Sequence, residues 1–171
     1  MNHRAAERAM SIGASLIPEF DQETATTRRV LERVPSEKGD WKPHPKSFSL
    51  AHLAQLVAWM PGWLPNMLRQ SELNLAASSP YSRETTATLL ELFDRGVRDG
   101  RDALAKAKDG DFAALWSLKH GDRVLASMPR SVVVRTHFSH MVHHRAQLGV
   151  YLRLLDVPVP SMYGPTADER M

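Results

Sequence analysis

Hydrophobic residues recur at helical spacing in four long stretches of the chain, and no stretch of comparable length alternates as a strand does. Pro61-Gly62 interrupts the second stretch and predicts a kink or a short break there. The helices are predicted at about residues 9–34, from Ser47 or Ser49 to about Met67, at 82–108 and at 130–156. This pattern predicts an all-α protein, built as a four-helix bundle.

Two connections between these helices are too long to be simple turns, so a plain up-down-up-down bundle is not expected. The first covers residues 35–46, where two prolines flank His44 and the imidazole is expected to fix the loop. The second covers residues 111–129 and contains the turn signal His120-Gly121-Asp122, which predicts a small extended hairpin. The chain contains no internal repeat or linker, so residues 1–171 are expected to form one domain.

Composition narrows the classes of function. The net charge is only +3, with basic residues dispersed among acids, so no nucleic-acid partner is expected. No apolar run approaches the roughly twenty residues that cross a bilayer, and a soluble cytoplasmic protein without a membrane partner is expected. The chain has no cysteine, which excludes disulfides, thiolate ligands and a thiol nucleophile from the chain itself. Any sulfur chemistry must therefore use an external thiol.

Half of the eight histidines fall within residues 137–144. At 100° per residue, His137, His140 and His144 lie within a sixth of a turn, on the stripe that the last helix should bury. An imidazole is costly to bury without a partner, and a divalent metal is an economical partner for histidines four residues apart. His143 points more than about 100° away from this stripe and is not expected to be a ligand.

Glu23 lies between Phe20 and Thr27 on the predicted inward side of the first helix. A buried carboxylate needs a cation or a hydrogen-bond donor. Glu23 is therefore either a catalytic candidate, as a general base or an acceptor beside a ligating imidazole, or the partner of an arginine.

Three segments together resemble the DinB family, within the DinB/YfiT-like metalloenzymes. They are residues 40–47 (DWKPHPKS), 140–148 (HMVHHRAQL) and 150–165 (VYLRLLDVPVPSMYGP). The resemblance implies a four-helix bundle with a long crossover, often a homodimer, and a divalent metal, zinc or nickel, held by three histidines. It also implies a small-molecule substrate and, in some relatives, transfer or isomerisation that uses an external low-molecular-weight thiol.

The resemblance assigns two metal ligands, His140 and His144, to the paired positions of the last helix. The family's second-helix histidine falls on Leu56, and His52 lies one turn earlier, about 5–6 Å along the axis and about 40° away in rotation. Three interpretations follow: His52 is the third ligand, His137 supplies it, or the metal has been lost. His52 is preferred, because His137 lies two turns from His144.

Enzymatic activity remains open at this stage. A metal-dependent thiol S-transferase or isomerase is one hypothesis, and water in place of the thiol gives a hydrolase. The alternative is a non-catalytic or degenerate helical dimer that binds a metal or a small ligand. The tryptophans indicate either core packing or an apolar ligand pocket. Apolar positions outside the central stripe of the last helix either support the homodimer that the resemblance implies or pack within the monomer. These two sets are Trp41, Trp59, Trp63 and Trp116, and Val142, Val150 and Leu154.

Overall fold

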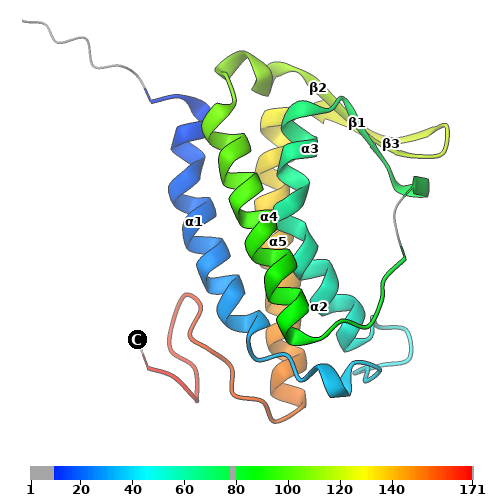
Figure 1. The fold of residues 1–171 in the computed structure, drawn as a ribbon, viewed down its shortest axis with the longest axis vertical. Helices are drawn as coiled ribbons and strands as arrows, with labels where there is room; N and C mark the ends of the chain where they lie inside the picture. Colours follow the sequence, from blue (N-terminus) through cyan, green and yellow to red (C-terminus); the bar gives the residue numbers. More distant parts are fainter. Residues whose placement is uncertain (1–9, 78–79, 171) are drawn as a thin grey trace, which may run out of the picture.

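The computed structural model describes residues 10–77 and 80–170, and its main body is a bundle of four helical segments (Figure 1). The four predicted helices are confirmed, although the expected start of the first, at Ala9, lies outside the described residues. The segments are α1 (Ile12–Leu31), α2 (Leu50–Trp59) continued by η2 (Met60–Trp63) and α3 (Leu64–Arg69), α4 (Thr86–Lys106) and α5 (Arg130–Leu154). Short 3₁₀ turns occur at η1 (Ser36–Lys38), η3 (Leu75–Ala77) and η4 (Asp109–Ala113).

Local chemistry explains where the helices begin and break. Ser49 caps α2, since its Oγ accepts from the backbone N–H of His52 at 3.2 Å. Thr85 caps α4, so this helix begins four residues later than the predicted start at residue 82. The predicted break at Pro61 is confirmed, because the chain tightens there into η2 before α3 continues the same segment.

The order of the helices around the bundle explains the long connections. α1 and α2 each pack against both α4 and α5 and lie diagonally across from one another. Figure 1 shows that α1 and α5 run in one direction and that α2, α3 and α4 run in the other. The consecutive segments α2–α3 and α4 are parallel neighbours, so residues 70–85 must run the length of the bundle, whereas residues 32–49 join two diagonal helices at one end. The long connection predicted at residues 35–46 is confirmed, but the crossover at residues 70–85 was not predicted.

The expectation of a purely all-α protein is wrong, because a small sheet covers one end of the bundle. The predicted hairpin is confirmed: β2 (Leu115–His120) and β3 (Arg123–Pro129) pair antiparallel around Gly121, whose φ is +60°. A third strand, β1 (Glu72–Asn74), pairs parallel with β2. Three residues are too few to show a period of two, so β1 left no signal in the sequence. The fold is mostly helical with a three-stranded sheet.

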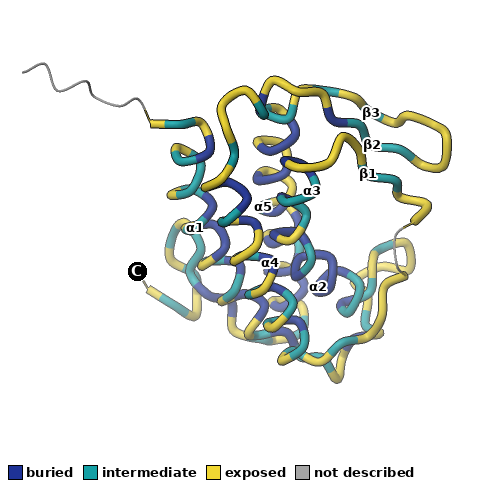
Figure 2. Tube along the Cα trace, turned by 45° about the horizontal axis from the view of Figure 1, so that its top comes forward, coloured by how far each residue is buried: buried dark blue, intermediate teal, exposed yellow. Residues whose placement is uncertain are grey.

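The bundle's buried residues line the interior faces of the four segments, as Figure 2 shows. Two glycines of α4 permit its closest approach to η2. A Cβ on Gly96 would lie 2.8 Å from the backbone nitrogen of Gly62, and one on Gly100 would lie 2.8 Å from the carbonyl oxygen of Pro61. Within the described ranges, no helix is both long and apolar enough to span a membrane.

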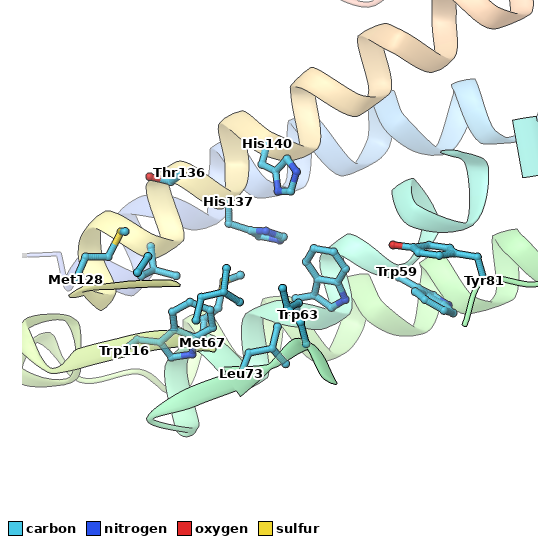
Figure 3. A pocket seen from close by; sticks show the side chains of 14 residues that line it. Trp59, Trp63, Met67, Leu73, Tyr81, Trp116, Met128, Thr136, His137 and His140 are labelled. Atoms are coloured by element: carbon cyan, nitrogen blue, oxygen red, sulfur yellow. The ribbon is translucent and has the colours of Figure 1, made fainter. Parts of the chain in front are cut away.

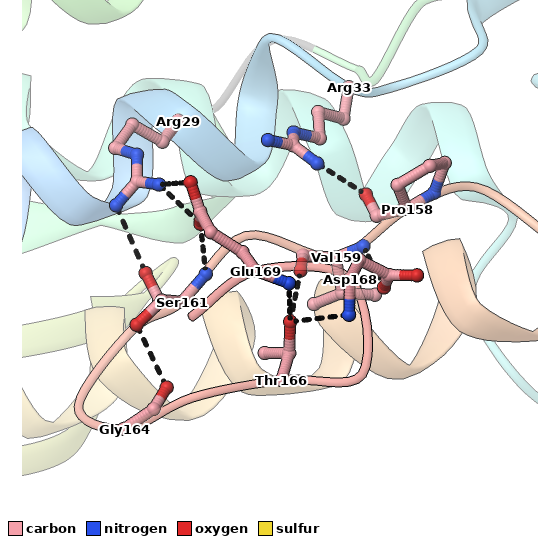
Figure 4. Close-up of polar contacts among 9 residues, drawn as sticks. All are labelled: Arg29, Arg33, Pro158, Val159, Ser161, Gly164, Thr166, Asp168 and Glu169. Carbon is pink, nitrogen blue, oxygen red and sulfur yellow. Dashed lines mark hydrogen bonds and ion pairs between the residues drawn. The ribbon is translucent and has the colours of Figure 1, made fainter. Parts of the chain in front are cut away.

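The C-terminal tail folds back along the bundle and is held by ion pairs (Figure 4). Arg29 of α1 pairs with Glu169, and Arg153 of α5 pairs with Asp168. Asp168 Oδ2 also accepts from the backbone N–H of Val159 at 2.8 Å. The two acidic residues thus tie the tail to helices that lie far from it in sequence.

Candidate metal and ligand site

His140 and His144 of α5 face one another, as their spacing of four residues predicts. Their Nε2 atoms lie 2.8 Å apart, and the Nδ1 of His144 lies 2.7 Å from Oε1 of Gln147. With Oε1 as the acceptor, His144 carries its proton on Nδ1 and presents a bare Nε2, to which the Nε2–H of His140 donates. A single proton therefore occupies the position on which two imidazole nitrogens converge.

Both imidazoles favour the neutral form. Burial lowers the pKa of His140, and the charges of His144 and His143 lower it further. Burial also lowers the pKa of His144, with the charge of His143 adding to the effect, whereas the hydrogen bond that His144 donates to Gln147 opposes it. Neutral imidazoles at neutral pH have the lone pairs that metal ligation requires.

The pair fits two positions of a divalent metal ion. Zinc–nitrogen bonds of about 2.0–2.1 Å at a tetrahedral angle separate two ligand nitrogens by about 3.3 Å, so the rings need to part by only about half an ångström. Within residues 10–77 and 80–170, no group of three or more His, Cys, Asp or Glu side chains is arranged to hold a metal. The described structure therefore brings two imidazole nitrogens together, with no third side chain of these types arranged beside them.

His52, the preferred third ligand, lies within an aromatic stack. Its ring centroid is 4.1 Å from that of Phe48 and 3.7 Å from that of Tyr81, with both pairs nearly parallel. Burial lowers the pKa of His52, and the charges of Lys42 and His144 contribute. Leu56, at the family's usual ligand position, is buried and packs in a cluster with other apolar residues, namely Met60, Met141 and Trp63.

His137, the alternative third ligand, forms a hydrogen bond with the backbone of Met60. Its side chain is buried, and Nε2 lies 2.9 Å from the carbonyl oxygen of Met60, so Nε2 carries the proton. Burial lowers the pKa of His137 to about 4, with the charge of His140 contributing and the bond to Met60 opposing. Its Nδ1 is buried and has no hydrogen-bond partner in the described part of the chain.

The other two histidines near the predicted site have local surroundings. His143 is exposed, as its helical phase predicted, and its ring lies edge-on to His144 at 4.9 Å between centroids. His44 is exposed and its Nδ1 accepts from the backbone N–H of Lys46 at 3.2 Å, so the ring fixes the proline-flanked loop.

Glu23 is buried, as predicted, and its cation is an arginine. Nη1 of Arg145 lies 2.6 Å from Oε2 of Glu23 without regular hydrogen-bond geometry, and donates to the backbone oxygen of Glu23 at 3.1 Å. Tyr163 of the tail donates to Oε1 of Glu23 at 2.8 Å. Tyr163 lies in no helical stripe, so its part in this contact had no signal in the sequence.

An apolar pocket of about 720 Å³ lies beside the histidine pair, between the helices and the sheet (Figure 3). Trp59, Trp63 and Trp116 line it, whereas Trp41 packs edge-on against Tyr151 in the core. His137 and His140 both line the pocket, although His137 is buried and His140 is exposed. Of the three histidines on the predicted stripe of α5, His137 and His144 are therefore buried and His140 is exposed.

Comparisons with known proteins agree on one fold. The model of the DinB family matches residues 10–170. A DinB-like protein from Bacillus subtilis shares 15% identity and a TM-score of 0.67, over 91% of this chain and 99% of that one. A DinB-like protein from Bacillus cereus shares 21% identity and a TM-score of 0.68, over 90% and 99%. No curated protein matches the chain. At these identities, the likeness to the solved structures establishes the fold alone.

Proposed function

The chain belongs to the DinB family, and from that premise we propose that it binds a divalent metal, zinc or nickel, through His140 and His144. One observation supports this above all: the two Nε2 atoms converge to 2.8 Å, and Gln147 holds the His144 tautomer that leaves its Nε2 bare. The metal takes the place of the single proton between the two rings.

The third ligand in this proposal is His52. Its support is that the charge of His144 contributes, after burial and the charge of Lys42, to the lowered pKa of His52. To ligate, its ring must leave the stack with Phe48 and Tyr81, a movement that a side chain only half-buried can make.

The reaction we propose is the transfer of an external low-molecular-weight thiol to a small electrophile. A bound divalent ion lowers the pKa of a thiol or of water enough to give a nucleophile near neutral pH. The chain has no cysteine, so the sulfur must come with the co-substrate. In this proposal the neutral imidazoles bind the metal ion, and the pocket beside His140 leaves room for the electrophile.

The second candidate is a small-ligand-binding bundle in which the metal site has decayed. Its supporting observation is Leu56, which fills the usual ligand position and packs in an apolar cluster with Met60 and Met141. Hydrolysis by water in place of the thiol is a variant of the enzymatic proposal.

Metal content of protein purified without an affinity tag or chelator tests the metal site. We expect near-stoichiometric metal in the wild type, its loss in His140→Ala and His52→Ala, and its retention in the matched control His143→Ala. A metal-free wild type that gains metal in Leu56→His overturns the proposal in favour of the decayed site. Retention in His52→Ala with loss in His140→Ala would remove only His52 from the ligand set.

The test for thiol transfer is turnover of a chlorodinitrobenzene with an added thiol. The thiolate forms a carbon–sulfur bond as the carbon–chlorine bond breaks and chloride leaves, so release of the coloured thioether reports the reaction. We expect turnover that depends on both metal and thiol and is lost in His140→Ala. Equal rates with and without the thiol would favour hydrolysis.

We also propose that the protein is a homodimer. Val150 and Leu154 on the outer side of α5 are 59% and 56% exposed, so they provide an apolar surface for a second copy. Light scattering at several concentrations tests this, and a monomer throughout would contradict it.

A further inference from the structure

The pocket beside His140 has the dimensions of a small-molecule site. Its volume of about 720 Å³ lies within the range of pockets that enclose drug-sized ligands, about 300–1,000 Å³. Helices form one wall, with Trp63 of η2 and His137 of α5, and the sheet forms the other, with Trp116 of β2 and Met128 of β3 (Figure 3). A space of this size suits a compact organic molecule better than a polypeptide segment.

The chemistry of the lining selects against charged ligands. None of the described side chains that line the pocket is Lys, Arg, Asp or Glu. An ion that entered would lose its hydration without gaining a counter-charge. His137 does not compensate, because it is neutral and its Nε2–H is used by the carbonyl of Met60. The indole N–H of Trp116 is likewise used, by Oδ1 of Asn66 at 3.3 Å.

The same lining favours flat, unsaturated ligands. Three indoles and the ring of Tyr81 contribute broad apolar faces, and Trp59 and Tyr81 already stack at 5.0 Å with 26° between their planes. Aromatic rings gain from offset stacking and edge contacts beyond the burial of their area. Two polar side chains of α5, Thr136 and His140, also line the pocket, and both are exposed.

From these observations we propose that the pocket binds a neutral, mainly apolar molecule that carries at least one aromatic ring, with its polar end beside Thr136 and His140. That this molecule is the electrophilic substrate rests on the proposed function, whereas its binding does not. The pocket then determines the class of substrate, and the histidine pair acts on the end that reaches His140.

Two fluorescent probes of one scaffold test the ligand class in the full chain after chelator treatment, because a metal on His140 would provide a counter-charge for a sulfonate. N-phenylnaphthylamine is neutral, and anilinonaphthalenesulfonate carries the same rings with a sulfonate. We expect one neutral probe to bind per chain, with the sulfonate at least about tenfold weaker. Equal affinity for the two probes, or no saturable binding of the neutral one, would overturn the proposal.

Two phenylalanine substitutions on β3 locate the binding. Ala126→Phe places a ring in the pocket, and the adjacent Ser127→Phe places the same ring on the opposite face of the strand. The first should raise the Kd of the neutral probe at least about tenfold and the second by less than about twofold. Far-ultraviolet circular dichroism checks that both variants fold. Similar effects of the two substitutions would place the probe elsewhere and contradict the proposal.

His144→Ala separates this inference from the proposed function, because His144 does not line the pocket. If both hold, this variant loses metal and still binds the neutral probe. If the His144→Ala variant retains both metal and probe binding, the proposed metal site is contradicted and the ligand pocket is not. If the wild type binds the probe weakly and dilution to monomers restores binding, a second copy of the chain occupies the pocket. That outcome would overturn the inference.

Discussion

Arg145 Nη1 lies 2.6 Å from Oε2 of Glu23, and the side chains of this pair are only 1% and 8% exposed. The contact joins α5 to α1 one residue after His144. Nε and Nη2 of Arg145 are buried without hydrogen-bond partners in the described part of the chain, so Glu23 is the principal compensation for this charge. The ring of Tyr163 covers the guanidinium at 5.2 Å and extends the contact to the tail.

We expect Glu23→Ala to destabilise the protein by about 3–5 kcal/mol, because it leaves the charge of Arg145 buried and uncompensated. The matched control is Asp21→Ala on the same helix, whose carboxylate pairs with Arg101 at the surface and should cost less than about 1 kcal/mol. Urea unfolding at neutral pH measures both. A double variant, Glu23→Ala with Arg145→Leu, should recover part of the loss, and a loss equal to the sum of the single effects would contradict this account.

Gln147 is expected to set the metal affinity through the tautomer of His144. Gln147→Leu removes the acceptor 2.7 Å from Nδ1 and should weaken metal binding by about 10–100-fold with little change in stability. Gln147→Glu retains an acceptor oxygen and should restore most of the affinity. Competition with a chelator of known affinity measures the difference. If the leucine variant binds metal as tightly as the wild type, Gln147 has no role in positioning the ligand.

The tail should open locally when its carboxylates are removed. Asp168 pairs with Arg153 and also accepts from the backbone N–H of Val159, but the ion pair is partly exposed. We therefore expect Asp168→Ala to cost under about 1 kcal/mol of global stability while it speeds amide exchange across residues 157–166. Hydrogen exchange followed by mass spectrometry resolves the segment, with residues 130–154 as the internal reference. Unchanged exchange in the tail would show that packing alone holds it.

The sequence predicted the features that depend on periodicity and on strong local signals. The helical stripes gave four segments, Pro61-Gly62 marked the break at η2, and His120-Gly121-Asp122 marked the hairpin. It did not predict β1, because this three-residue strand is defined only by its pairing with β2, more than forty residues away.

In the candidate site, too, the contacts within one helix were predictable and those between distant segments were not. Helical spacing alone brings His140 to His144, so the pair was predictable. The stack of His52 between Phe48 and Tyr81 was not, because Tyr81 reaches it from the connection that follows the second helical segment. The burial of Glu23 followed from its phase in α1, whereas the identity of its partner depended on how α1 and α5 pack.

Close packing of Gly100 in α4 predicts that its substitution destabilises the protein, whereas substitution of Gly110 in η4 should not. Gly100→Ala should destabilise by about 1–3 kcal/mol despite the better helix propensity of alanine, since its Cβ would lie 2.8 Å from the carbonyl oxygen of Pro61. Gly110→Ala is the control, because a Cβ there meets nothing within 4 Å. Thermal and urea unfolding compare the two. Equal stability of both variants would mean that η2 yields easily to α4.

His137 should make the protein sensitive to mild acid. Its pKa is about 4 in the folded protein and 6.5 when unperturbed, so the unfolded chain binds more protons at every pH between these values. Stability from this residue is therefore fully present above about pH 6.5, declines as the pH falls, and is lost by about pH 4. The shift corresponds to about 3 kcal/mol over the whole window.

The comparison that isolates this effect is His137→Gln, whose amide can still donate to the carbonyl of Met60 but does not titrate. Urea unfolding in chelator-treated buffer should show the wild type losing about 2–3 kcal/mol more than the variant between pH 7.5 and pH 4.5. His140 and His144, whose pKa values are also lowered, titrate in both proteins, so most of their contribution cancels in the difference. Parallel pH profiles of the two proteins would show that protonation of His137 does not lower the stability of the folded state. That result would contradict a buried ring whose pKa is lowered by burial.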